Sequence, residues 1–170
     1  MFPFSHFFTG YVVAVVLIPT GLVELSGVNV VLFGVLSLLP DADAFWHSEI
    51  GSHHLSLFHA PIFWILVSTV TSALFPQKGI ILASATLTHI LTDFVTGRTV
   101  GVAFLCPFSS DEYSLYSLND ETSQLNPVRP RKDVLKRHLS MYLENKTLIM
   151  FEAAVNLAGA AGLLVLVLWL

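Results

Sequence analysis

Five apolar runs, separated by short polar clusters, set the pattern of this chain. A helix needs about 20 residues to cross the hydrocarbon of a bilayer, and most of the runs reach that length, alone or with their flanking residues. The second run is short, so it either starts near Glu24, thins the bilayer locally or packs inside the bundle. The pattern predicts an all-α, multi-pass transmembrane bundle of about five helices. The runs are Phe7–Val23, Gly27–Leu39, Ala60–Phe75, Gly79–Val95 and Leu148–Leu170.

Helix-breaking residues mark the ends of several runs. Pro19 and Gly21 predict that the first helix frays at its far end, and Pro40 predicts the end of the second helix. The residues Gln77, Lys78 and Gly79 predict a tight turn between the third and fourth helices.

The composition agrees with a membrane protein. The chain is 54% hydrophobic and only 12% charged, whereas roughly a quarter of the residues in soluble domains are charged. No stretch rich in Gly, Ser or Pro divides the sequence, so we expect residues 1–170 to form a single domain. The first residues lack the positive charge of a secretory signal, and the first run is therefore expected to stay in the protein.

The basic residues add orientation to this picture, because seven of the eight Lys and Arg lie between Arg98 and Lys146. The positive-inside bias predicts that the polar segment 96–147 is cytoplasmic. Alternating spans then place the N-terminus on the cytoplasmic side of the inner membrane and the C-terminus outside. Apolar residues among the cations predict an amphipathic surface helix that attracts anionic lipid, with simple electrostatic anchoring as the alternative. These apolar residues are Val134, Leu135, Leu139 and Met141.

The polar clusters at the ends of the apolar runs carry the candidate chemistry. Under the predicted topology, all of them fall on the cytoplasmic face. Ionisable side chains at the edge of the hydrocarbon are costly and usually have partners and a function. We therefore predict that they converge on a metal site. The predicted ligands are His6, Asp41, Asp43, His54, His59, His89 and Asp93.

The spacing of these residues suits metal binding without proving it. His89 and Asp93 are four residues apart, so both can reach one cation from one face of a helix, although such a pair can also simply share a hydrogen bond. Asp41 and Asp43 can aim two carboxylates into one cavity, although this pattern is also common in helix caps and solvated turns. The donors outnumber the three or four that one zinc uses, so we expect two or three zinc ions, with manganese or magnesium as alternatives.

Five short stretches of the sequence together resemble the motifs of the inner-membrane metal-dependent hydrolase family, also described as LexA-binding. The resemblance covers roughly residues 5–109, and this family is in turn distantly similar to zinc-dependent phospholipases C and single-strand nucleases. The resemblance implies a helical enzyme with clustered metals that hydrolyses phosphoesters, and it gives the seven candidate ligands that role. The stretches are Ser5-His6, Leu39-Pro40-Asp41-Ala42-Asp43, His54 to His59, His89-Ile90-Leu91-Thr92-Asp93 and Cys106-Pro107-Phe108-Ser109.

One motif departs from the family pattern. Where the family usually reads His-Arg-Gly-x-Thr-His-Ser, this chain reads His54-Leu55-Ser56-Leu57-Phe58-His59-Ala60. An arginine at this position could bind a phosphate group, so this chain lacks a phosphate-binding residue that the family pattern has. Three alternatives stay open: Arg98 or a basic residue within 129–137 replaces it, the substrate differs, or the protein is inactive.

Four further polar residues are weaker candidates. Glu152 can bind metal or act as a general base, with an interhelical hydrogen bond as the alternative. Arg98 can bind phosphate, whereas His47 and His53 are expected to support the ligands or to be solvated. The catalytic candidates are Asp41, Asp43, Glu152 and Arg98.

The leading functional hypothesis is a membrane-bound hydrolase of a lipid or lipid-linked phosphoester, which uses a metal-activated water at the cytoplasmic interface. The expected partners are membrane lipids and this substrate, and no nucleic-acid partner is indicated. A divalent-metal carrier is one alternative, although carrier sites usually lie near the midplane between inverted repeats, and we find no such repeat. The other is a non-catalytic membrane regulator that has a structural metal site and a basic segment for a cytosolic partner. The oligomeric state stays open.

Overall fold

The computed structural model describes residues 3–45, 56–96, 102–109, 111, 113, 115 and 146–170. Over these residues the chain forms five α-helices, one for each apolar run, together with short 3-10 turns. An isolated antiparallel bridge joins Val102 to Tyr113, and the described residues contain no β-strand. The prediction of an all-α bundle is therefore confirmed. The helices are α1 (Pro3–Leu17), α2 (Gly27–Leu36), α3 (Pro61–Leu74), α4 (Pro76–Thr96) and α7 (Lys146–Trp169), and the turns are η1 (Ile18–Thr20), η2 (Leu39–Phe45) and η4 (Leu57–His59).

Two of the described helices are long and apolar enough to cross a membrane, namely Pro76–Thr96 and Lys146–Trp169. Three shorter apolar helices accompany them, over Phe4–Thr20, Gly27–Leu36 and Pro61–Leu74. The number of crossings beyond these two therefore stays a prediction. The amphipathic helix expected around 134–141 lies outside the described residues.

The helix ends follow the breaks in the sequence with one exception. The first helix gives way to the turn η1, and Gly21 ends that turn in the left-handed region, with φ 77°. The turn predicted at Gln77 to Gly79 is wrong, because the chain reverses at Phe75 and α4 begins at Pro76. Proline suits the first turn of a helix and disfavours helical geometry in the residue before it.

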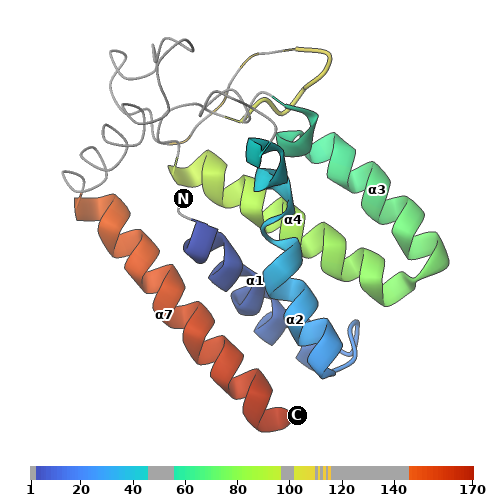
Figure 1. Cartoon of the computed structure of the whole chain (residues 1–170), viewed down its shortest axis with the longest axis vertical. Coiled ribbons are helices and arrows are strands. Elements are labelled where there is room, and N and C mark those ends of the chain that lie inside the picture. The colour runs from blue at the N-terminus through green and yellow to red at the C-terminus, as the bar shows by residue number, and fades with distance from the viewer. Residues whose placement is uncertain are drawn as a thin grey trace.

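Helix α1 is the centre of the bundle and packs against α2, α4 and α7. Helices α3 and α4 pack along each other as an antiparallel pair, and α7 runs along the outer side of α1 (Figure 1). Apolar side chains from α1, α2 and α4 form the main buried cluster, which includes Tyr11, Phe33 and Ile81. This packing holds the beginning of α1 beside the end of α4, where the polar residues gather.

Glycines let the helices approach closely. A Cβ at Gly10 in α1 would overlap the backbone carbonyl of Phe33 in α2, and one at Gly159 in α7 would overlap the backbone of Phe8 in α1. Small residues are the usual means by which membrane helices bring their backbones together. The positions of α2 and α7 relative to α1 therefore depend on these two glycines.

We expect Gly10→Ala to lower the free energy of unfolding by about 1–3 kcal/mol, because the added methyl group must push α1 away from α2. Unfolding in detergent micelles with increasing dodecyl sulfate, followed by circular dichroism, measures the change. Gly27→Ala is the matched control, since nothing lies within 4 Å of a Cβ at that position. Equal stability losses in the two variants would contradict the close α1–α2 contact.

Candidate metal centre

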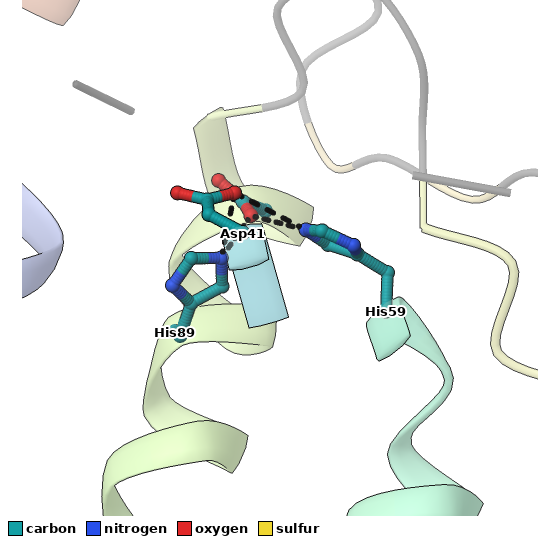
Figure 2. Close-up of side chains that lie close together, drawn as sticks. Asp41, His59 and His89 are labelled. Atoms are coloured by element: carbon teal, nitrogen blue, oxygen red, sulfur yellow. Dashed lines mark ion pairs between the residues drawn. The ribbon is translucent and has the colours of Figure 1, made fainter. Parts of the chain in front are cut away.

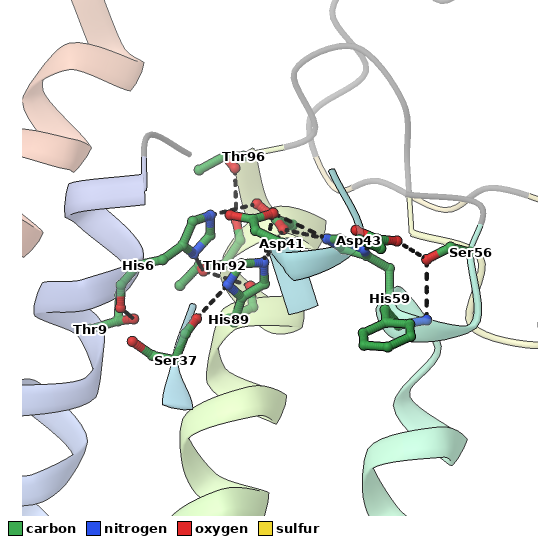
Figure 3. A network of polar contacts seen from close by, with 12 residues as sticks. His6, Thr9, Ser37, Asp41, Asp43, Ser56, His59, His89, Thr92 and Thr96 are labelled. Carbon is green, nitrogen blue, oxygen red and sulfur yellow. Dashed lines mark hydrogen bonds and ion pairs between the residues drawn. The ribbon is translucent and has the colours of Figure 1, made fainter. Parts of the chain in front are cut away.

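One end of the bundle gathers the polar residues that the sequence places at the ends of its apolar runs (Figure 3). His6 comes from the first turns of α1, and His89 and Asp93 come from the end of α4. Asp41 and Asp43 lie on η2, which follows α2, and His59 closes η4 just before α3. The structure thus brings these six residues to one end of the bundle, and their role as metal ligands stays a prediction.

Four of these residues bring their ligand atoms within 4.8 Å of one another, namely Asp41, His59, His89 and Asp93. His89 Nε2 lies 3.0 Å from Asp93 Oδ2 and 3.5 Å from Asp41 Oδ1. His59 Nε2 lies 3.4 Å from Asp41 Oδ1 and 3.8 Å from Asp93 Oδ2. Figure 2 shows the Asp41 carboxylate facing both imidazoles. Two imidazoles and two carboxylates at these separations could hold one divalent cation, which zinc usually binds through four ligands.

A backbone contact fixes the proton on His89. Its Nδ1 lies 2.7 Å from the carbonyl oxygen of Ser37, at the end of α2. A carbonyl can only accept, so His89 donates from Nδ1, and its Nε2 is turned toward Asp41 and Asp93. A backbone hydrogen bond of this kind also orients the ring of a metal-binding histidine.

His89 Nε2 faces oxygens of Asp41 and Asp93, and positive charge between these groups, from a proton on the ring or from a cation, stabilises the arrangement. His59, His89 and Asp93 are buried, so water screens these groups poorly. A divalent cation could supply this charge and bind the same imidazole and carboxylate atoms. The residues present therefore fit a metal ion.

Asp41 is the side of this group that solvent can reach. Its side chain is 24% exposed, whereas those of His59, His89 and Asp93 are at most 4% exposed. Burial raises the pKa of the Asp41 carboxyl, but His89 and His59 lower it more, so the net pKa lies below the usual range. Asp41 is therefore an anionic carboxylate at the open side of the group.

His6 and Asp43 flank the four-residue group on opposite sides. His6 Nε2 lies 3.1 Å from Asp93 Oδ1, and its ring stacks on that of His89. Asp43 accepts a hydrogen bond from the Ser56 hydroxyl through Oδ2, which lies 3.9 Å from His59 Nδ1. Asp43 thus lies near His59 on the side away from Asp41, beyond hydrogen-bond distance.

Glu152 lies outside the four-residue group. The buried hydroxyl of Ser5 in α1 donates to Glu152 Oε2 in α7 at 2.9 Å. The structure thus contains the interhelical hydrogen bond that the sequence left open for this residue. The other candidates fall outside the described residues, namely His47, His53, His54, Arg98 and the basic residues of 129–137.

Two functional groups escaped the sequence analysis. The Thr92 hydroxyl contacts His6. The only feature of the sequence that could have indicated this role is that Thr92 precedes Asp93 at the end of a helix. The Ser37 carbonyl that holds His89 carried no signal, because a backbone acceptor is not visible in a residue type.

We expect His59→Gln to weaken zinc binding by at least about tenfold, because it removes one donor of the four. Competition with a chromophoric chelator measures the affinity in detergent solution. His138→Gln is the matched control, since it changes a histidine of the segment 96–147 and no residue of the four. Unchanged affinity in a folded His59→Gln protein would remove His59 from the ligand set.

Comparison with known proteins agrees with the membrane character of the chain. No curated protein and no solved structure matches it. A family model described as the YdjM inner membrane protein matches residues 1–169, which is nearly the whole sequence. The chain therefore belongs to the YdjM inner membrane protein family.

Proposed function

We propose that this inner-membrane protein is a metal-dependent hydrolase that acts on a phosphoester of a lipid or a lipid-linked molecule. The observation that carries the proposal is the four-residue group itself, in which two buried imidazoles and two carboxylates bring their ligand atoms within 4.8 Å of one another. The group is open at Asp41, so a small molecule can approach it from one side.

Asp41, His59, His89 and Asp93 would hold the cation. Imidazole and carboxylate donors together favour zinc, with manganese or magnesium as alternatives, and the number of donors supports two or three ions in total. When bound, the metal would polarise a phosphoryl oxygen and lower the pKa of a water molecule. The chain's own part is to orient the His89 ring through the Ser37 carbonyl and to keep water away from the buried side.

Asp41 is the best-placed residue to accept a proton from the attacking water, because it is the partly exposed carboxylate of the group. Asp43 lies near His59, and Glu152 remains a further catalytic candidate beside the first turns of α1. Arg98 follows the end of α4 closely in the sequence. As a fixed cation, it is our candidate for the phosphate clamp that the altered motif lacks.

The position of the group along α4 supports a substrate in the membrane. Asp93 lies in the last turn of a helix long enough to cross the bilayer, and the end of such a helix lies at the level of the lipid headgroups. The basic residues of 96–147 support a cytoplasmic site and N-terminus, with the C-terminus outside. We further propose that the shorter apolar helices complete a multi-pass bundle, as one domain over residues 1–170.

The same position argues against the main rival. A carrier has to expose its site alternately to both sides, and such sites usually lie near the bilayer midplane. Here the ligands come from one end of α4 and from turns beside it. A regulator with a structural metal site has one argument in its favour, which is the departure of residues 54–60 from the family motif.

We expect the purified protein, reconstituted in phosphatidylglycerol vesicles with zinc, to release phosphorylated headgroup. Asp41→Asn should reduce the rate by at least about a hundredfold, as is usual when an electrostatic catalytic group is removed. Release of labelled headgroup, with bis(p-nitrophenyl) phosphate as a soluble probe, measures the rate. Glu24→Gln is the control, because Glu24 is exposed at the other end of the bundle, where its backbone meets Gln77.

The other outcomes separate the rivals. Zinc uptake into the vesicles without hydrolysis would indicate a carrier. Bound zinc with neither uptake nor hydrolysis of either probe would indicate a regulator. Absence of bound zinc, manganese and magnesium would defeat every function that depends on the metal centre.

A further inference from the structure

An apolar projection, formed by residues 102–109, follows α4 at the end of the bundle. Figure 1 shows it in yellow, at the end where α4 stops and α3 begins. The sequence from Val100 to Phe108 contains no charged, amide or hydroxyl side chain, although it belongs to the segment 96–147 that the charge bias places in the cytoplasm. The proposed function gives this projection no part.

The base of the projection is fixed on the helices. Val102 and Ala103 are buried, and Val102 exchanges two backbone hydrogen bonds with Tyr113. The ring of Phe104 packs edge-on against that of Phe94 in α4. The apolar cluster that includes Val102 also takes in side chains of α3 and α4. The place of the projection relative to these two helices is therefore set by packing.

The tip of the projection faces away from this base. Leu105 is 55% exposed, and Phe108 is the most exposed large apolar side chain of the described residues, at 85%. The N–H groups of Phe108 and Ser109 both donate to the carbonyl of Leu105, at 2.7 Å and 3.1 Å. A closed turn thus presents two large apolar side chains outward, which is typical of a surface that contacts a membrane or another protein.

The level of the projection favours lipid as its partner. At a rise of about 1.5 Å per residue, the 21 residues of α4 span about 30 Å, which matches the hydrocarbon of a bilayer. The end of α4 at Thr96 then lies near the lipid headgroups, and so does the projection that packs beside it. Other exposed apolar side chains occur at this end of the bundle, namely Leu57 in η4 and Ile62 in the first turn of α3.

The polarity of the chain changes directly after the tip. The Ser109 hydroxyl donates to the carboxylate of Asp111, which is exposed. Apolar side chains are thus followed at once by a polar pair, as is common in segments that lie at the boundary between acyl chains and headgroups. The tip backbone also suits a poorly hydrated place, because the N–H groups of Cys106, Phe108 and Ser109 donate within the chain.

We propose that the projection lies in the headgroup region of the inner membrane beside the end of α4, with Leu105 and Phe108 inserted among the upper acyl chains. The partner is the lipid surface itself. Phe58, which precedes His59, packs against the same apolar cluster as the projection. The insertion therefore holds the candidate metal centre at the level of the headgroups. This inference rests on the membrane character of the chain and requires no bound metal.

The depth of a spin label at the tip tests the proposal. Full-length protein with Cys106→Ser carries a nitroxide on one introduced cysteine, at Phe108→Cys or at Leu105→Cys, in vesicles of phosphatidylethanolamine and phosphatidylglycerol without added metal. Electron paramagnetic resonance measures collisions with oxygen, which concentrates in the acyl region, and with a water-soluble nickel chelate. We expect both labels to favour oxygen, and to lie less deep than a label at Leu157→Cys, on the exposed side of α7 near its middle.

Asp111→Cys in the same background is the matched control, because it lies just beyond the tip on the polar side. Its label should collide mainly with the nickel chelate. Two tip positions give a result even if one variant does not fold. If Cys106→Ser itself does not fold, the nitroxide is attached to Cys106, which lies between Leu105 and Phe108 in the sequence.

Two results would overturn the proposal. Tip labels as accessible to the nickel chelate as the label at Asp111→Cys would place the tip in water. Tip labels shielded from both reagents would mean that protein covers the tip, either another segment of the chain or a second copy. Both results would leave the proposed metal centre untouched, because the measurement involves no metal ligand.

Discussion

The structure depends on one buried contact, in which the imidazoles of His6 and His89 face the two oxygens of the Asp93 carboxylate. The Ser37 carbonyl accepts a hydrogen bond from Nδ1 of His89, and the Thr92 hydroxyl contacts Nδ1 of His6, so both rings keep Nε2 turned toward Asp93. Positive charge, on the rings or on a cation, stabilises this contact. The surrounding fold therefore holds the side chains of the candidate metal centre in place.

The packing of the helices keeps His6 and Asp93 in contact, although they come from different helices. His6 belongs to α1 and Asp93 to α4, so their contact requires these helices to stay in register at one end of the bundle. At the other end, Lys78 in α4 donates to Asn29 in α2, and Asn29 donates to the carbonyl of Glu24. Polar contacts thus hold both ends of α4, at Lys78 and at Asp93. Between these ends, α4 packs through apolar side chains.

The sequence predicted the helices and most of the site because both rest on residue type and spacing. Apolar runs set the helices, and the four-residue spacing of His89 and Asp93 placed two donors on one face. It did not predict that α4 begins at Pro76, because a polar triplet looked like a turn. It also gave equal weight to Asp41 and Asp43, although their exposure and partners differ. That difference arises from contacts between distant segments, which spacing does not encode.

The use of the Ser37 carbonyl has a thermodynamic consequence. The last carbonyls of a helix have no partner within it. At the end of α2, the Ser37 carbonyl accepts a hydrogen bond from His89 instead. Lengthening α2 by a turn would withdraw that acceptor and release the ring. Under the proposed function, the free energy with which a cation binds to His89 would therefore also hold the end of α2 closed against α4. Loss of that cation would then make local opening at the end of α2 easier.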